Sequence, residues 1–319
     1  MNARRRRVYG IVNPTAALGK ARRFWTKLRE LLQEQIGPFS WDWTESPLQA
    51  TALARSALQQ GYDLIISVGG DGTHNEVING FFTDGKVQNS QAILAVVSCG
   101  SGGDLIRSLG TASDISSALG TLLTGSTRRV DVGHLKFTLP SGDTGERLFL
   151  NVASLGLSAR VCSLLSNQPR FLGGSGRYFL ATVRALMANQ NERVTLDIDG
   201  NTLPSQLVNT AAIANGQFFG GGMRVAPRAR LDDGMLDMVV IGPVGLLDFV
   251  RWGSRLYQGK HLNHPRIDHY KASRIHASSD SPVLVEADGE TLGTLPATFT
   301  VLPQAIRILV PGQAVGTKH

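Results

Sequence analysis

The chain has 319 residues, and 42% of them are hydrophobic, which is enough apolar material for the cores of two domains. Its two cysteines, Cys99 and Cys162, lie far apart in the sequence, which excludes a disulfide scaffold and a cysteine-ligated metal site. The formal net charge of +7 favours polyanionic partners, among them nucleotide phosphates, anionic lipid headgroups and nucleic acid.

The sequence contains no apolar run of the ~18 residues that a membrane-spanning helix needs. Near its start, Arg4–Arg7 carry four positive charges, but Asn13 and Pro14 follow too soon for the apolar core of a signal peptide. We therefore expect a cytoplasmic protein without a transmembrane segment.

The first 126 residues alternate strand and helix patterns. Strands are expected at 7–12, 39–43, 64–68 and 92–97, and helices at 18–36, at 48–60 and from about residue 73 onward. The runs Leu64–Val68 and Ala92–Val97 are continuously apolar, which is typical of parallel strands covered on both faces. Alternating units of this kind predict an open α/β domain with a parallel sheet.

From residue 127 the pattern changes to short strands separated by Gly, Asn and Pro. Strands are expected at 130–139, 147–153, 193–199, 207–214, 236–241, 274–277, 283–287 and 298–302, and helices at 158–165 and 177–188. This pattern is typical of an antiparallel β-sandwich. We therefore predict two domains, 1–126 and 127–304, with the last residues of the chain packing back onto the first domain.

The most informative motif is Gly69–Glu76, which follows a buried strand and opens a helix. Ligands of open α/β sheets collect at the carboxyl ends of the strands. Glycines allow backbone N–H groups to approach a phosphate, and the start of a helix adds partial positive charge. Asp71 is placed to bind magnesium or to accept a proton. A tight turn with Asp and Thr as helix caps is the alternative, and one glycine-rich loop does not decide between them.

Further segments repeat this chemistry. They are the strand-to-helix loops Asn13–Lys20 and Gly100–Arg107, the segment Asn215–Met223 with Leu231–Gly234, and the late motif Glu286–Glu290. Their order and spacing, from Val8 to about Leu302, resemble the bacterial diacylglycerol kinase family, which is related to sphingosine and ceramide kinases. The resemblance implies an ATP-dependent lipid kinase. Its active site would lie in the cleft between an α/β nucleotide-binding domain and a lipid-binding β-sandwich.

The resemblance also implies roles for individual residues. Glu290 would accept the proton of the lipid hydroxyl, with Asp71 and Asp288 as further catalytic carboxylates, and Asp71 remains the alternative base. Nucleotide contacts would come from Asn13, Pro14, Thr15, Ala16, Ala17, Thr44, Gly70, Asp71, Gly72, Thr73, His74, Asn75, Glu76, Ser101 and Asp104. On the sequence pattern alone, an exposed helix histidine is the preferred interpretation of His74.

Two magnesium positions are implied by the same resemblance. One lies around Asp71, within a network of carboxylates that includes Asp104 and Asp131. The other is structural, with the Asp233 side chain and the main-chain oxygens of Arg230 and Met235 as ligands. Oxygen ligands of this kind, completed by water, suit a hard octahedral ion.

One loop departs from the family pattern, which commonly reads Gly-Thr-Gly-Asn-Asp. Here it reads Gly100-Ser101-Gly102-Gly103-Asp104, so Ser101 keeps a hydroxyl for phosphate whereas Gly103 removes an amide side chain. The Gly100–Asp104 loop is therefore expected to keep its phosphate chemistry with one hydrogen-bonding group fewer.

Several alternatives remain open. The acceptor expected first is diacylglycerol, which would give phosphatidic acid; a sphingoid base, ceramide or phosphatidylglycerol are the alternatives. An NAD kinase-like enzyme and a non-catalytic lipid or nucleotide sensor are more remote. The partners expected are ATP and a lipid at the inner face of a membrane, with peripheral association, and a homodimer is left open. No basic stripe with interleaved aromatic residues is present, so we expect no nucleic-acid partner.

Overall fold

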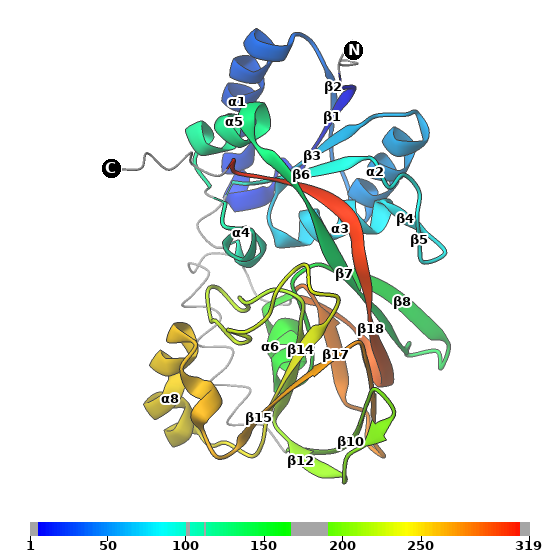
Figure 1. Ribbon diagram of the computed structural model, residues 1–319, viewed down its shortest axis with the longest axis vertical. Coiled ribbons are helices and arrows are strands. Elements are labelled where there is room, and N and C mark those ends of the chain that lie inside the picture. The colour runs from blue at the N-terminus through cyan, green and yellow to red at the C-terminus, as the bar shows by residue number, and fades with distance from the viewer. Residues whose placement is uncertain (1–5, 100–102, 112, 167–190, 313–319) are drawn as a thin grey trace. The chain divides into compact units, whose positions relative to one another are not determined.

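Figure 1 shows the computed structural model of the chain, which describes residues 6–99, 103–111, 113–166 and 191–312. Two compact units divide the chain. Unit 1 comprises residues 1–130 with 304–319, and unit 2 comprises residues 131–303. The strands β7 (Ser126–Thr138) and β18 (Glu290–Val310) each contribute residues to both units.

Unit 1 is an α/β unit whose sheet has the order β18–β6–β3–β1–β2, with every pair of neighbours parallel. Besides the end of β18, its strands are β1 (Val8–Val12), β2 (Ser40–Trp43), β3 (Leu64–Gly69) and β6 (Ile93–Ser98). The described helices are the 3-10 turn η1 (Ala16–Gly19), α1 (Lys20–Ile36), α2 (Gln49–Gln59), α3 (Asp71–Gly80), α4 (Asp104–Leu109) and α5 (Ile115–Thr124). A small hairpin of β4 (Phe82–Thr83) and β5 (Lys86–Val87) follows α3.

The helices of unit 1 lie on both faces of its sheet. In Figure 1, α1 and α5 cover one face and α2 and α3 lie together on the other. On α1, Trp25, Leu28 and Leu32 recur at helical spacing and are at most 1% exposed, because this stripe packs on β1 and β3. Burial of each such side chain stabilises the fold by about 1.5–3 kcal/mol. The expected helix at 18–36 begins two residues later, because Ala17 and Leu18 adopt left-handed φ angles of 52° and 58°.

Unit 2 is an antiparallel, sandwich-like unit. Besides its parts of β7 and β18, its strands are β8 (Thr144–Phe149), β9 (Val152–Gly156), β10 (Glu192–Ile198), β11 (Asn201–Thr202), β12 (Gln206–Val208), β13 (Thr210–Ala214), β14 (Leu236–Ile241), β15 (Ile267–Ala272), β16 (Arg274–Ser278) and β17 (Leu284–Ala287). One path runs β15–β14–β13–β9–β17–β18, while β10 pairs with β11, β12 and β16, and β7 pairs with β8 and β18. The described helices are α6 (Leu157–Ser166), α8 (Leu246–Gln258) and the 3-10 turn η2 (His261–Asn263).

The predicted fold class is confirmed, and two expected strands prove to be interrupted. The strand expected at 207–214 breaks at Asn209, because β12 pairs with β10 whereas β13 pairs with β9 and β14. The strand expected at 147–153 breaks at Leu150 and Asn151, whose N–H groups donate to a carboxylate instead of a neighbouring strand. The helix expected at 177–188 lies outside the described residues.

No helix of the described part of the chain combines the length and the apolar character that crossing a membrane requires.

Candidate active site

The first glycine loop joins β3 directly to α3. A Cβ at Gly69 would lie 2.5 Å from the Thr73 hydroxyl oxygen, so the close approach of strand and helix requires glycine there. Gly70 is extended, with φ −109° and ψ −177°, and a Cβ at this position would meet no atom within 4 Å. The backbone before α3 is therefore open on the side where Gly70 lacks a side chain, and Gly72 and Thr73 lie in the first turn of α3.

Asn13 connects the ends of two strands. Its backbone N–H donates to the Val68 carbonyl at 2.9 Å, and its Nδ2 donates to Thr73 Oγ1 at 3.0 Å. Its Oδ1 accepts from the backbone and the hydroxyl of Thr15, at 3.0 and 2.8 Å. Three predicted nucleotide contacts, Asn13, Thr15 and Thr73, thus form one hydrogen-bonded group.

The other predicted contacts in this region lie at strand ends or helix starts. Thr44 donates its N–H to the Val12 carbonyl at 2.9 Å and so lies just beyond β2. Pro14, Ala16 and Ala17 belong to the turn that leads into α1. Ser101 lies outside the described residues.

Asp71 links the first glycine loop to α4. Its carboxylate accepts the backbone N–H groups of Asp104, at 2.9 Å, and of Leu105, at 3.4 Å. A carboxylate at the start of a helix is stabilised by the partial positive charge there. The neighbouring Asp104 is buried and forms an ion pair with Arg107 at 3.2 Å. Asp71 and Asp104 are therefore held next to each other by the backbone of α4.

His74 is not exposed, so the interpretation drawn from its pattern is wrong. The ring is completely buried, and its Nδ1 lies 2.7 Å from the Ser67 hydroxyl. Burial lowers the pKa of His74 from 6.5 to about 3, so the imidazole is neutral. A neutral ring offers no positive charge to a phosphate.

Glu76 faces α2, since its Oε2 accepts the Ala50 N–H at 3.2 Å and its carbonyl accepts from the Thr51 hydroxyl at 2.8 Å. Asn75, the residue before it, is also buried, being 1% exposed. The contacts of Glu76 hold α2 and α3 together. Its predicted contact with the nucleotide stays a prediction.

The late acidic motif of unit 2 forms a hairpin turn between β17 and β18. Ala287 pairs with Glu290, and the two residues between them have left-handed φ angles of 48° at Asp288 and 89° at Gly289. Positive φ at both central positions defines a type I′ turn, which favours the Asp-Gly sequence. The carboxylate of Asp288 accepts three consecutive backbone N–H groups, those of Leu150, Asn151 and Val152, at 2.9, 3.0 and 3.1 Å. Asp288 therefore fastens the turn to the β8–β9 connection.

Glu290 is the first residue of β18 and remains accessible. Its side chain is 38% exposed and forms an ion pair with Arg147 of β8, with 2.5 Å between Oε2 and Nη2. The Arg147 side chain is only 12% exposed. The sequence analysis did not identify Arg147, because a single arginine in a strand has no motif around it.

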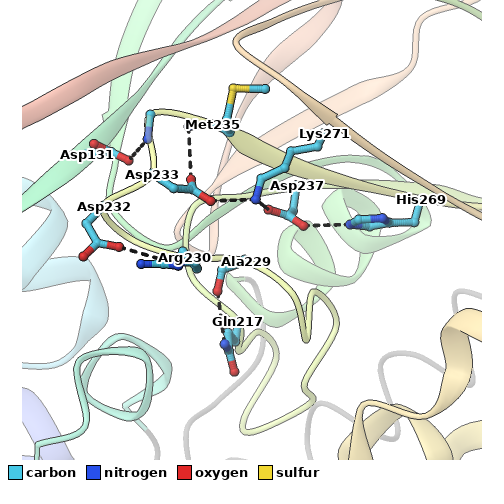
Figure 2. A network of polar contacts seen from close by, with 11 residues as sticks. Asp131, Gln217, Ala229, Arg230, Asp232, Asp233, Met235, Asp237, His269 and Lys271 are labelled. Carbon is cyan, nitrogen blue, oxygen red and sulfur yellow. Dashed lines mark hydrogen bonds and ion pairs between the residues drawn. The ribbon is translucent and has the colours of Figure 1, made fainter.

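The predicted structural magnesium site lies in a network of polar contacts (Figure 2). The turn is tied to Asp131, whose Oδ2 accepts the Gly234 N–H at 2.7 Å. Asp233 Oδ1 accepts the Met235 N–H at 3.2 Å, while its Oδ2 lies 2.6 Å from Lys271 Nζ. The Arg230 side chain reaches Asp232 at 3.5 Å, which leaves the main-chain oxygen as the predicted ligand at that position.

The donor types at this turn fit magnesium, because they are a carboxylate and carbonyl oxygens. However, the Lys271 ammonium already balances the charge of Asp233, so an ion at the predicted position would have to compete with it. Across the described residues no cluster of three or more His, Cys, Asp or Glu side chains forms a metal site. Magnesium at Asp233 therefore stays a prediction.

Comparisons with known proteins match both parts of the chain. Residues 7–135 match the family described as the diacylglycerol kinase catalytic domain, and residues 151–310 match the YegS C-terminal NAD kinase beta sandwich-like domain. A diacylglycerol kinase of Staphylococcus epidermidis is 30% identical over 269 residues, which cover 84% of this chain and 80% of the relative.

Two solved structures extend the comparison. One from Bacillus anthracis, assigned as a diacylglycerol kinase, shares 26% identity at a TM-score of 0.76 and covers 95% of this chain and 96% of its own. An NAD kinase from Archaeoglobus fulgidus, solved in complex with ATP, shares the fold at a TM-score of 0.53 with 13% identity over 95% of this chain and 94% of its own.

The α/β unit with its glycine loop, the sandwich unit with its acidic turn and the matched domains define a lipid kinase, which is a phosphotransferase. Within that class, the chain belongs to the bacterial diacylglycerol kinase family.

Proposed function

We propose that the protein transfers the γ-phosphoryl group of ATP to the primary hydroxyl of diacylglycerol and so forms phosphatidic acid. The proposal rests on the Glu290 carboxylate. It is accessible, forms an ion pair with Arg147 and directly follows a turn that the Asp288 side chain holds through backbone hydrogen bonds. In a lipid kinase, such a carboxylate is suited to accept the proton of the attacking hydroxyl. General base catalysis of this kind is typically worth about 10²–10⁴-fold in rate.

In this proposal unit 1 binds the nucleotide phosphates. The open backbone at Gly70 and the start of α3 would approach the phosphate oxygens, as would the turn after Asn13. Lys20 at the start of α1 and Arg107 of α4 would offset their negative charge. Phosphoryl transfer depends mainly on such positioning and charge neutralisation.

Magnesium would accompany the phosphates near Asp71 and Asp104. The carboxylate oxygens of these residues are the donors that magnesium takes alongside nucleotide phosphates, so the residues fit the ion. When bound, the ion would neutralise charge on the phosphates. The α4 N–H groups orient the Asp71 carboxylate for this task.

The acceptor is tested by incubating the protein and labelled ATP with diacylglycerol, a sphingoid base, ceramide, phosphatidylglycerol and NAD, each in separate reactions. We expect phosphatidic acid from diacylglycerol and no product from NAD. Faster phosphorylation of another lipid would reassign the substrate, and absence of any labelled lipid would refute the proposed function. The match of unit 2 to a domain described as YegS C-terminal makes the other lipids necessary arms of this assay.

We further propose that the enzyme reaches its lipid by peripheral contact with an anionic membrane. Three basic side chains, Arg228, Arg255 and Lys260, line a hollow of about 670 Å³ at the end of α8. Among the described residues no carboxylate pairs with any of the three, and the Arg255 guanidinium lies 4.1 Å from the centre of the Trp252 ring. Basic side chains near an anionic surface contribute on the order of 1 kcal/mol each, and salt screens this attraction.

Sedimentation with vesicles tests the membrane contact. Replacing Arg228, Arg255 and Lys260 with alanine should weaken binding to anionic vesicles, and high salt should weaken wild-type binding in the same way. Arg251 is exposed on the same helix but does not line the hollow, so R251A is the matched control. Unchanged binding of the triple variant would exclude this surface as the contact.

A further inference from the structure

A second glutamate lies directly beneath the turn that carries Glu290. Glu286 of β17 is completely buried, and its Oε2 accepts the backbone N–H of Gly289 at 2.9 Å. Its Oε1 shares a short hydrogen bond with the hydroxyl of Ser154 on β9. The carboxyl therefore bridges a neighbouring strand and the centre of the hairpin turn. In the described part of the chain its hydrogen bonds go to these two partners.

The surroundings of Glu286 suit a neutral carboxylic acid. The Ser154 hydroxyl lies 2.6 Å from that of Ser158, which in turn lies 3.5 Å from the Leu155 carbonyl. In the structure the Ser154 hydroxyl donates to Glu286 Oε1. A protonated Glu286 can reverse this chain: it donates to Ser154, Ser154 donates to Ser158, and Ser158 donates to the carbonyl, so every hydroxyl proton also has an acceptor when the acid is neutral. Burial raises the pKa of Glu286 to about 8 and outweighs the hydrogen bonds from the Ser154 hydroxyl and the Gly289 N–H, which lower it; the nearby Asp288 charge adds a smaller rise.

The charged groups on the elements packed against β17 are engaged elsewhere. Arg160 pairs with Glu192, Glu146 pairs with Lys136 and His134, and Arg147 pairs with Glu290. Cys162 on α6 is a buried thiol whose pKa is raised by burial and by Glu286, and β9 carries no titratable side chain. No cation among the described residues is therefore bonded to Glu286 to stabilise its ionised form.

We propose that Glu286 is a positioning residue: it holds the Asp288–Gly289 turn so that Glu290 stands where it can accept the substrate proton. This inference rests on the proposed function. Asp288 fixes the turn from one side through three N–H groups, and Glu286 fixes it from the other through the Gly289 N–H. Ionisation of Glu286 would put a second negative charge beside Asp288, which would repel the turn that Glu286 holds.

The test compares E286Q, which keeps the shape of the neutral acid, with E286A, which removes the hydrogen bond to Gly289. E192Q is the matched control, since Glu192 is a glutamate of the same unit that contacts Arg160 and Ser281 instead of the turn. The kcat and the KM for ATP are measured with detergent-dispersed lipid between about pH 6 and about pH 10.

We expect the wild-type kcat to fall above about pH 8 and the E286Q kcat to lack this fall while staying within a few-fold of wild type at neutral pH. E286A should lose about tenfold or more in kcat with little change in the KM for ATP, because a misplaced catalytic group costs rate rather than nucleotide affinity. An alkaline fall that persists in E286Q, or an E286A variant that behaves like E192Q, would overturn the proposal.

A readout that needs no activity separates this inference from the proposed function. Hydrogen exchange at the Gly289 amide should be slow in wild type and E286Q and faster in E286A, with the core amides of the same unit unchanged as the control for folding. Equal exchange in all three would show that Glu286 does not hold the turn. If wild type phosphorylates no lipid, the proposed function fails and the catalytic part of this inference fails with it, while slow Gly289 exchange would still confirm the anchoring.

Discussion

The two units prepare their reactive positions differently. In unit 1 the backbone sets the geometry: Asp71 accepts the N–H groups that open α4, and the first glycine loop is open main chain at Gly70. In unit 2 side chains hold a hairpin turn, with Asp288 binding three N–H groups and Glu286 a fourth. A site built from backbone groups can be recognised in the sequence by its glycines. A turn held by side chains cannot, because the hydrogen-bonding partners come from strands that are distant in the sequence. Substitutions in each unit test this difference.

The largest effect is expected on turnover. E290Q should reduce kcat by about 10²-fold or more, because the amide cannot accept the substrate proton, and should leave the KM for ATP nearly unchanged. D71N should change both constants, since the Asp71 carboxylate organises the start of α4 as well as the site. Steady-state kinetics on folded variants measures both, and a wild-type rate for E290Q would show that another group is the base.

The next largest effect is expected on the stability of unit 2. D288A leaves three N–H groups without their acceptor, and each unsatisfied donor costs about 1–3 kcal/mol when it is not reached by water. D288N should cost less, since asparagine tolerates the left-handed turn and its amide oxygen still accepts. Urea unfolding measures the free energies of unfolding. Equal stability of D288A and wild type would mean that the turn is held without Asp288.

Buried titratable groups should give the two units opposite responses to pH. Glu286 has a pKa raised from 4.5 to about 8, so its folded protonated form stabilises at low pH, and this stability is lost as the pH rises from about 4.5 through about 8. His74 has a pKa lowered from 6.5 to about 3, so its contribution is present above pH 6.5 and is lost as the pH falls toward 3.

Melting curves across the pH range test this contrast. E286Q should flatten the alkaline side of the stability profile and H74Q the acid side, each relative to its own value at neutral pH. Identical profiles for wild type and both variants would show that these groups are not held in the protonation states that their burial favours.

The smallest effect is expected at the Asp233 turn. Magnesium that binds only the folded protein should raise Tm by mass action, by a few degrees at saturation for a unit of this size. K271M should bring the rise to lower magnesium concentrations, because Lys271 no longer competes for Asp233, and D233A should abolish it. Equal magnesium responses in wild type, K271M and D233A would exclude this turn as a metal site.

The sequence predicted the buried parallel strands closely, since β3 and β6 are continuous apolar runs that only a two-sided core can accept. It did not predict α8 or β15. The apolar residues of α8 follow those of β14 almost without a break in the sequence. Strand β15 lies at the end of the strand order, and as an edge strand it carries Asp268, His269 and Lys271 among its apolar residues.

For the candidate site, the motifs predicted Asp71, Asp288 and Glu290, but not the partners that orient these side chains. Arg147 and the N–H groups that bind Asp288 come from strands far away in the sequence, and no local pattern marks them. His74 did carry a signal, since it precedes Val77, Ile78 and Phe81 at helical spacing and thus belongs to their apolar stripe. The interpretation of His74 as an exposed helix residue did not take that spacing into account.

Gly103 shows how the residue at one position can constrain which residues fit at a neighbouring position. Where the family commonly has asparagine, this chain has Gly103, and a Cβ there would lie 2.7 Å from Ile106 Cγ1 and 3.2 Å from the Ser98 hydroxyl. Ile106 is itself buried, at 6% exposure. A G103N substitution therefore requires the Ile106 side chain to move or to be shortened, and shortening a buried side chain lowers stability through the cavity that it leaves. Positions 103 and 106 are thus coupled through packing, so G103N combined with a shorter residue at 106 should cost less stability than G103N and the shortening added separately.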